Sequence, residues 1–128
     1  MPLIFSGPGL GRSRCDRPVQ LLDIYPTLVE LCSLTKPPQK LEGHSLLPLL
    51  SQPNSPWPYP AITTFHCNDH SVRTERWRYI SYANGDEELY DHSLDSNEWH
   101  NLVHNLKYQA VIAELKAHLP KVNVPQAR

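Results

Sequence analysis

The sequence predicts an α+β fold in which a small antiparallel sheet of three or four strands is covered by a C-terminal helix. Three observations support this prediction. Residues 61 to 91 hold short runs rich in β-branched and aromatic residues. Asn84-Gly85 lies between two of these runs, and this dipeptide is the strongest short-range hairpin signal. Apolar residues then recur at helical spacing between 108 and 119.

The predicted strands cover residues 61–66, 70–75, 77–83 and 88–91. Both Asn84 and Gly85 tolerate the positive φ that a type I′ turn demands, so we expect that turn between the last two strands. Two or three strands alone are marginally stable, and one face of the sheet therefore needs a cover.

The cover is the predicted C-terminal helix. Asn105 fits an N-cap and Pro120 ends the segment. Apolar side chains between them recur at steps of four, three and four, at Tyr108, Ile112, Leu115 and Leu119. The tail from Lys121 to Arg128 is expected to fray.

The first half of the chain is less regular. Residues 3–5 read as a buried strand that ends in Ser6-Gly7-Pro8-Gly9. Residues 18–32 predict a short helix, a break at Pro26-Thr27, and a second helical stretch from Thr27, with Pro26 in its first turn. Residues 34–60 are rich in proline but too apolar for a free linker, so they predict a packed connector.

Composition excludes several classes of function. The chain has 128 residues, enough for one domain or for part of a larger one. Its 12 Lys and Arg against 13 Asp and Glu give a formal charge of −1, which does not favour binding to nucleic acid or an anionic membrane. No apolar run approaches the roughly 18 residues of a membrane span. The N-terminus lacks the pattern of a secretory signal, so none is expected.

The cysteines predict neither a disulfide framework nor a paired metal site. Cys15, Cys32 and Cys67 are odd in number and widely spaced. We interpret them as buried free thiols.

Three local clusters suggest chemistry, and each has a simpler structural explanation. His66, Cys67 and His70 are possible metal ligands, but in an extended strand the two histidines lie roughly 13 Å apart, so a loop between strands is favoured. Residues 6–11 lack the spacing of a phosphate-binding loop and favour a turn after a strand. Glu87, Glu88 and Asp91 are candidates for acid and base work, but at the mouth of a hairpin a solvated strand edge is favoured.

Longer segments resemble a known family. They are "PLIFSGPG", "PVQLLDIYPTLVELC", "LEGHSLLPLL", "HSVRTERWRYI" and "ELYDHSLDSNEWHNL", in this order along residues 2 to 102. Together they resemble the C-terminal portion of the formylglycine-dependent sulfatases, most closely the bacterial iduronate-2-sulfatase-like group. The resemblance extends from residue 2 to about residue 119.

The resemblance implies a position for each part of the chain within an alkaline-phosphatase-like fold. Residues 1–33 would be the terminal strand and helices of the large α/β domain, and residues 34–60 the connector. Residues 61–120 would form the C-terminal subdomain, and 121–128 its tail. The hairpin would then be a packing module rather than the catalytic centre.

The family's catalytic groups are not found in this sequence. Its nucleophile is a formylglycine made from Cys or Ser in a C/S-x-P-x-R motif, and a divalent cation, usually calcium, holds the sulfate. Cys15, Cys32 and Cys67 are not followed by Pro two places on, and Ser6 has Pro8 but Leu10 where Arg is required. The resemblance places the nucleophile and the metal ligands upstream of this chain.

Two residues are candidates for contact with substrate. In related enzymes the segment that matches "HSVRT" lies near the mouth of the substrate pocket, so His70 and Arg73 could meet a uronate carboxylate or a neighbouring sulfate. The alternative is that Arg73 anchors the sheet to the large domain through an ion pair.

Two classes of function follow from the sequence. In the first, the chain is the C-terminal part of a sulfuric ester hydrolase that acts on sulfated sugars such as iduronate-2-sulfate. Its partner would be the N-terminal catalytic part, and alone it would be inactive. In the second, it is a non-catalytic binding module derived from that fold. The parent family is often periplasmic or secreted, while this sequence predicts no compartment.

Overall fold

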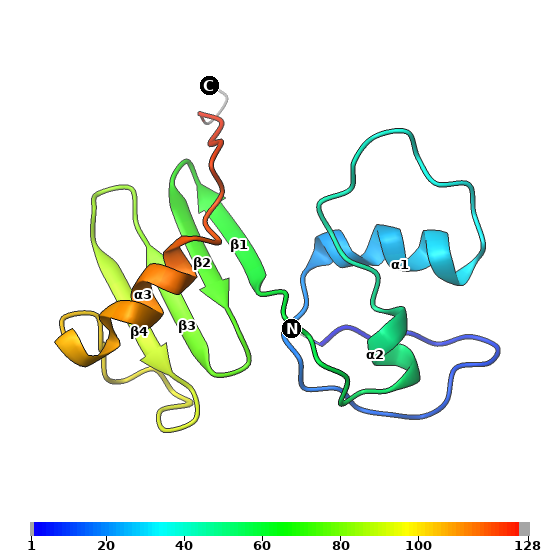
Figure 1. The fold of residues 1–128 in the computed structure, drawn as a ribbon, viewed down its shortest axis with the longest axis horizontal. Coiled ribbons are helices and arrows are strands. Elements are labelled where there is room, and N and C mark those ends of the chain that lie inside the picture. Colours follow the sequence, from blue (N-terminus) through cyan, green and yellow to red (C-terminus); the bar gives the residue numbers. More distant parts are fainter. Residues whose placement is uncertain (1, 126–128) are drawn as a thin grey trace. The chain divides into compact units, whose positions relative to one another are not determined.

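The computed structural model describes residues 2–125 and divides the chain into two compact units, with the boundary between Pro58 and Tyr59 (Figure 1). Each unit is described by itself. Within residues 2–125 no helix is both long and apolar enough to cross a lipid bilayer. Residues 126–128 of the predicted tail lie outside the described residues, and 121–125 form neither helix nor strand.

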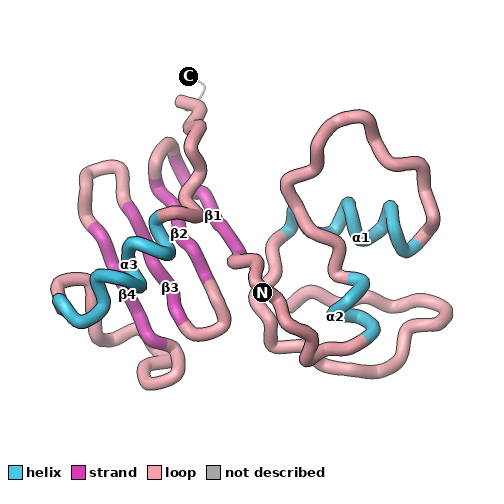
Figure 2. The backbone as a smooth tube through the Cα atoms, viewed as in Figure 1, coloured by secondary structure: helices cyan, strands magenta, loops and turns pink. Residues whose placement is uncertain are grey.

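The second unit contains a four-stranded antiparallel sheet, coloured magenta in Figure 2, with the strands in sequence order. The predicted strands are confirmed with small shifts at their ends: β1 is Ala61–His66, β2 is Asp69–Arg73, β3 is Trp77–Ser81 and β4 is Glu87–Asp91. The order follows from the short connections, because consecutive strands joined by tight turns pair with each other.

A helix covers one face of this sheet, as predicted (Figure 1). The covering segment is the 3-10 helix η2, Leu106–Tyr108, followed by α3, Gln109–Lys116. The Asn105 side chain accepts a hydrogen bond from the Lys107 N–H at 3.1 Å and so caps η2. The core between helix and sheet consists of Val72, Tyr79, Leu89, Val103, Ile112 and Leu115.

Helix α3 ends earlier than predicted, at Lys116 rather than next to Pro120. The N–H groups of His118 and Leu119 donate to the carbonyls of Leu115 and Lys116, three residues back. The last turn is therefore tighter than an α-helix. The ring of Pro120 disfavours the α conformation in the residue before it, which accounts for this end.

The β3–β4 hairpin forms at Asn84-Gly85, but the predicted type I′ turn is wrong. Gly85 has φ +91°, whereas Asn84 is not among the described residues with positive φ. The Gly85 N–H donates to the Tyr82 carbonyl at 3.0 Å, and the Tyr82 N–H donates to the Asp86 carbonyl at 3.0 Å. This is a three-residue loop in which a type I turn is followed by a glycine bulge.

The first unit is built from helices and connecting segments. The 3-10 helix η1, Leu21–Asp23, runs directly into α1, Ile24–Leu31, and a short helix α2, Leu47–Ser51, lies in the connector. The predicted break at Pro26-Thr27 is therefore wrong: the change from 3-10 to α geometry comes earlier, between Asp23 and Ile24. Pro26 lies in the first turn of α1, where its missing N–H costs no helical hydrogen bond.

Two of the sequence motifs meet in this unit and fix α1 against the connector. The Asp23 carboxylate accepts from the His44 N–H at 2.9 Å, and the Thr27 hydroxyl accepts from the Leu46 N–H at 2.9 Å. Gly43 directly precedes these contacts, and an added Cβ there would be 1.9 Å from the Leu22 carbonyl oxygen. The motifs "DIYPT" and "EGHSL" are thus two halves of one polar contact.

The strand predicted for residues 3–5 is not formed. These residues have no regular secondary structure, and Ile4 is 82% exposed. A strand needs the N–H and C=O groups of a neighbour, and the described residues of this unit contain no other strand.

The predicted burial of the cysteines is also wrong. All three thiols are free, but Cys32 is exposed and Cys15 and Cys67 are only half-buried. Cys15 donates to the Pro53 carbonyl at 3.2 Å. Cys32 is the C-cap residue of α1, and no other segment of the described residues covers its side chain.

Candidate functional site

The register of the sheet separates the two residues predicted to contact substrate. Successive side chains of a strand point to opposite faces, so positions three apart lie on different faces. His70 is in the row Thr64–His70–Ser81 and Arg73 in the row Ala61–Arg73–Arg78–Tyr90. Val72 shares the face of His70 and packs in the α3 core. His70 and Arg73 therefore do not form one cationic pair.

His70 lies on the helix-covered face and is only 5% exposed. Its Nδ1 is 2.9 Å from the Thr64 hydroxyl. Its Nε2 is buried, with no hydrogen-bond partner among the described residues. In this unit the ring is therefore buried, and its contact with substrate stays a prediction.

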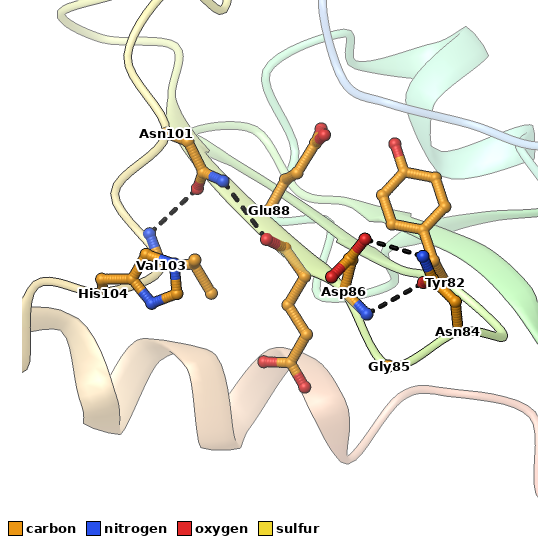
Figure 3. Close-up of a pocket in the computed structure, with 9 residues that line it drawn as sticks. Tyr82, Asn84, Gly85, Asp86, Glu88, Asn101, Val103 and His104 are labelled. Atoms are coloured by element: carbon orange, nitrogen blue, oxygen red, sulfur yellow. Dashed lines mark hydrogen bonds between the residues drawn. The ribbon is translucent and has the colours of Figure 1, made fainter.

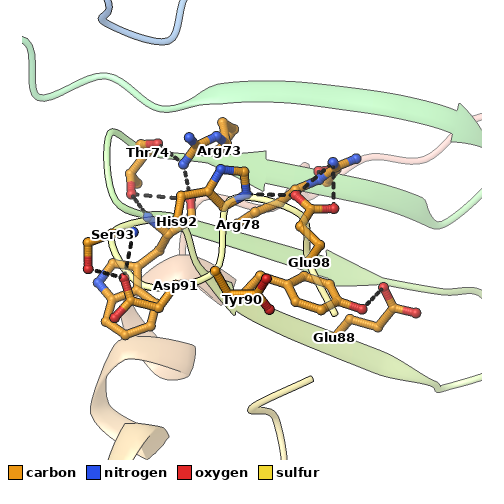
Figure 4. A network of polar contacts seen from close by, with 12 residues as sticks. Arg73, Thr74, Arg78, Glu88, Tyr90, Asp91, His92, Ser93 and Glu98 are labelled. Carbon is orange, nitrogen blue, oxygen red and sulfur yellow. Dashed lines mark hydrogen bonds and ion pairs between the residues drawn. The ribbon is translucent and has the colours of Figure 1, made fainter. Parts of the chain in front are cut away.

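Arg73 lies on the face of the sheet opposite α3 and holds the turn that connects β2 to β3. Its Nη1 donates to the carbonyls of Thr74, Glu75 and Trp77 at 2.6, 3.3 and 3.3 Å (Figure 4). Partial burial lowers its pKa, an effect that the nearby Glu98 opposes and Arg78 adds to. Among residues 2–125, its other two nitrogens have no hydrogen-bond acceptor, so they are available to an added anion.

Arg78 and Glu98 extend this polar surface. Arg78 Nη1 is 3.0 Å from both carboxylate oxygens of Glu98, and Arg78 Nε donates to the Ser71 hydroxyl at 3.2 Å. His92 Nε2 is 2.6 Å from Glu98 Oε1 (Figure 4). Burial disfavours the charged form of Glu98, but hydrogen bonds from His92 and Arg78 outweigh it, so the pKa of Glu98 is lowered.

Asp91 is not at a solvated edge, contrary to the prediction for the acidic group at 87–91. It is 1% exposed. Its carboxylate receives two parallel bonds from Arg76, at 3.0 Å from Nε and 2.6 Å from Nη2, and a third from the Ser93 hydroxyl at 2.6 Å. These bonds, those from Arg76 above all, hold the pKa of Asp91 far below its ordinary range. A carboxylate that stays ionised near neutral pH has no proton to donate as a general acid, and its low pKa makes it a weak general base.

The remaining acidic and amide residues of the last motif also support the fold. Asp95 accepts from the His100 N–H at 2.8 Å, and this bond lowers the pKa of Asp95. Asn101 Oδ1 accepts from the N–H groups of Leu89 and Val103, both at 3.0 Å. "ELYDHSLDSNEWHNL" therefore describes strand β4 and the loop that its hydrogen bonds tie back to that strand.

A pocket of about 590 Å³ lies at the tip of the β3–β4 hairpin (Figure 3). Its lining includes three carboxylates, and each has a partner: Asp86 with the Asn84 amide, Glu87 with Lys116, and Glu88 with the Tyr90 hydroxyl. Burial, together with Glu88, raises the pKa of Tyr90 to about 12. Like charges repel, so a wall of this sign disfavours a sulfate or uronate group.

The described residues do not fit the cofactors that the sequence resemblance implies. Within residues 2–125 no group of three or more His, Cys, Asp or Glu side chains is arranged to hold a metal ion. The candidate ligands at 66–70 are separated by a tight turn, with His66 opposite Asp69 and His70 directed into the core. No step of a reaction can be assigned to a metal or formylglycine held by these residues.

Sequence reasoning missed the residues that accompany Arg73. Arg78, His92 and Glu98 come from two segments up to 20 positions apart, and their meeting depends on the β3–β4 register and on the course of the loop after β4. The only sequence signal was the presence of Glu98 in the "D-x-x-E" pattern, which carries no information about its partner.

In the comparisons with known proteins, most of this chain is matched, but only a small part of each relative is. Residues 1–125 match the family described as N-sulphoglucosamine sulphohydrolase, C-terminal. A protein named sulfatase from Formosa agariphila is 42% identical over 123 residues, which are 95% of this chain and 24% of that protein. Arylsulfatase K of Mus musculus is 36% identical over 121 residues, 80% of this chain and 21% of that protein. The chain thus spans about a quarter of the length of these relatives.

Solved structures show the same pattern, in which most of this chain aligns with a small part of a sulfatase. The 2-O GAG sulfatase BT1596 is 32% identical and aligns with a TM-score of 0.59 over 74% of this chain and 22% of its own. A second structure, BT4656 in complex with D-glucosamine-2-N,6-O-disulfate, is 22% identical with a TM-score of 0.63 and supports the fold.

Proposed function

Because this chain belongs to the sulfatase family, as a C-terminal domain of those enzymes, we propose that it is the C-terminal part of a sulfuric ester hydrolase and that it acts beside an N-terminal catalytic part. One observation carries the proposal. The match covers nearly the whole chain but only about a quarter of its relatives, at 95% and 24% for the first of them. The polar residues of its last motif stabilise the fold of this domain, which fits a structural contribution to the whole enzyme.

On this proposal the chain alone does not turn over sulfate esters. Sulfate ester hydrolysis in this family needs a nucleophile and a cation that stabilises the sulfate, and these groups would come from the catalytic part. What the described residues can contribute is positioning: Arg73, with two nitrogens directed to no acceptor, could hold an anionic group of the substrate. His70, enclosed in the core, is not needed for that role.

We further propose that the substrates are sulfated sugars, with iduronate-2-sulfate as the first candidate. A solved relative with 32% identity is a 2-O GAG sulfatase, which supports a sugar sulfated at that position. The similarity to arylsulfatase K is compatible with other sulfate esters, so the sugar is the part of the proposal that needs its own assay.

A chimera tests the proposal. The C-terminal quarter of the Formosa agariphila sulfatase is replaced by this chain, and sulfate release is measured with added calcium on a chromogenic sulfate ester and on a 2-O-sulfated uronate disaccharide. We expect hydrolysis by the chimera, and none above background by this chain alone or by the shortened relative. Turnover by the isolated chain would contradict the proposal.

Arg73 provides the second arm of that experiment. In the chimera, Arg73→Lys keeps the charge but loses the planar pair of donors, so KM for the uronate substrate should rise while kcat changes little. Lys107→Arg, an exposed cation of η2, is the control. Equal effects on the uronate and on an aryl sulfate that has no carboxylate would assign Arg73 to the turn rather than to the uronate carboxylate.

A further inference from the structure

Asn84 is the one asparagine of this sequence that is followed by a glycine. The backbone nitrogen of the residue after an asparagine can attack the side-chain carbonyl carbon, and glycine has no Cβ that hinders this approach. Asn84 and Gly85 are both exposed at the tip of the β3–β4 hairpin, so water reaches the reacting atoms. The other asparagines precede residues that carry a side chain; they are Asn54, Asn68, Asn97, Asn101, Asn105 and Asn123.

Asp86 holds the side-chain amide of Asn84 from both ends (Figure 3). The Asp86 N–H donates to Asn84 Oδ1 at 3.0 Å, and Asn84 Nδ2 donates to the Asp86 carboxylate at 2.7 Å. A backbone N–H only donates and an ionised carboxylate only accepts, so these two partners fix which end of the amide is the oxygen. When a nucleophile adds to Cγ, negative charge develops on Oδ1. The Asp86 N–H therefore already lies where it would stabilise that oxyanion.

The attacking nitrogen is the part of this geometry that opposes the reaction. The Gly85 N–H donates to the Tyr82 carbonyl at 3.0 Å, and this bond must open before the nitrogen can lose its proton and reach Cγ. The bond lies at an exposed loop tip, where local opening costs little compared with opening of the core. The fold thus slows the first step slightly and favours the addition that follows it.

We propose that Asn84 is a deamidation site of this chain, at which the Gly85 nitrogen is the nucleophile and the Asp86 N–H stabilises the oxyanion. Hydroxide removes the proton from the Gly85 nitrogen. The N–Cγ bond then forms, the Cγ–Nδ2 bond breaks, and Nδ2 takes a proton from water and leaves as ammonia. One water molecule opens the resulting cyclic imide at either of its two carbonyls, which gives aspartate or isoaspartate at position 84. The reaction consumes water and needs no oxidant or reductant.

The product changes the pocket at the hairpin tip. A carboxylate oxygen takes the place of the nitrogen that donated to Asp86, so two like charges repel where a hydrogen bond was present. One negative charge is added to a pocket that three carboxylates already line. The isoaspartate product also lengthens the main chain by one carbon, which disturbs the hydrogen bonds of the three-residue loop. The modified hairpin should be less stable, and its pocket should repel anions more strongly.

The test uses a matched asparagine in the first unit. Asn54 is exposed, and the Ser55 N–H donates to the Gln52 carbonyl at 2.9 Å, which is the turn bond that Gly85 makes to Tyr82. Within residues 2–125, the side chain of Asn54 makes no hydrogen bond. Ser55→Gly therefore creates a second Asn-Gly pair with the same turn bond but without a donor to the side-chain oxygen. Glycine is permissive at this bend, so the variant should fold.

The full chain with Ser55→Gly is incubated at mildly alkaline pH in water enriched in heavy oxygen, both folded and in urea, and peptide mass spectrometry follows each asparagine. In the folded chain Asn84 should react roughly two- to tenfold faster than Asn54, which corresponds to a donor worth about 0.5–1.4 kcal/mol in the barrier. In urea the two should react at equal rates, because the donor is no longer positioned. Asp86→Ala keeps the backbone N–H, so the preference should persist in that variant.

Each other outcome contradicts a named part of the proposal. Equal rates in the folded chain, or faster loss of Asn54, would overturn the role of the Asp86 N–H. A preference for Asn84 that persists in urea would assign it to the local sequence and would also overturn that role. An Asn84 that remains intact in the folded chain would overturn the modification site itself. None of these measurements depends on hydrolysis of a sulfate ester, so they leave the proposed function untouched.

Discussion

At the scale of single residues, Asp91 is the polar group on which the second unit depends most. It is buried and bound by Arg76 and Ser93. Asp91→Asn replaces a carboxylate oxygen by an amide that faces the Arg76 donors, so we expect a loss of about 2 kcal/mol in the free energy of unfolding at pH 7. Urea unfolding measures it, with Asp86→Asn as the control, because Asp86 is exposed at the hairpin tip.

The same residue predicts a dependence on pH. The pKa of Asp91 is lower in the folded chain than in the unfolded one, where it is about 3.9. The stabilisation is therefore complete above that value and is lost as the pH falls below about 4. The difference in unfolding free energy between the wild type and Asp91→Asn should shrink between pH 5 and pH 2. A difference that stays constant over this range would contradict the role of the charge.

Gly43 makes the corresponding prediction for the first unit. A Cβ at this position would lie 1.9 Å from the Leu22 carbonyl oxygen and 2.8 Å from the Asp23 nitrogen, both backbone atoms that cannot turn away. Gly43→Ala should separate the connector from α1 at a cost of about 1–3 kcal/mol. Hydrogen exchange at the His44 and Leu46 amides, which donate to Asp23 and Thr27, should accelerate. Gly11→Ala is the control, because nothing lies within 4 Å of its added Cβ.

Residue roles were the hardest part to predict from the sequence. The sequence identified the segments that matter, including "DIYPT" and the last acidic motif, through their resemblance to the sulfatase family. It could not assign Asp91 to the interior, because that depends on which face of β4 is covered, and a shift of register by one residue reverses the assignment. The separation of His70 from Arg73, by contrast, follows from the predicted strand 70–75 alone, because positions three apart in a strand lie on opposite faces.

At the scale of elements, the β3–β4 turn offers a test of local geometry. Gly85 has φ +91°, and an L-residue there costs about 1–2 kcal/mol. Gly85→Ala should therefore lower the free energy of unfolding by that amount. Asn84→Ala should cost less than half as much, because the backbone of Asn84 does not have positive φ. In a type I′ turn both substitutions would be costly, so equal losses in urea unfolding would contradict the observed turn.

Elements of the second unit were predictable because local and tertiary signals agree there. β1 has the predicted limits, 61–66, and the period of Tyr108, Ile112 and Leu115 correctly identified the covering helix. The strand at 3–5 shows the opposite case. Its composition favours a strand, but composition supplies no partner for the backbone, and within the described part of the first unit there is none.

At the scale of the whole molecule, the two units should differ in stability when the chain is isolated. In the second unit Val72, Tyr79 and Leu89 are completely buried, and β3 is paired on both sides. The first unit leaves several apolar side chains exposed to water, namely Ile4 and, along η1 and α1, Leu21, Tyr25, Leu28 and Leu31. Because protection from hydrogen exchange follows the local free energy of opening, amides of residues 77–91 should exchange far more slowly than those of residues 2–32.

This difference should depend on the partner, since it has its origin in missing contacts rather than in poor local structure. On the proposed function, the catalytic part present in the chimera covers the exposed apolar residues of α1 and supplies a neighbour for residues 3–5. The protection of residues 2–32 should then rise towards that of 77–91, while the second unit changes little. Hydrogen exchange followed by mass spectrometry resolves both segments in one experiment. Equal protection of the two segments in the isolated chain would show that the first unit needs no further contacts for its stability, and would contradict this prediction.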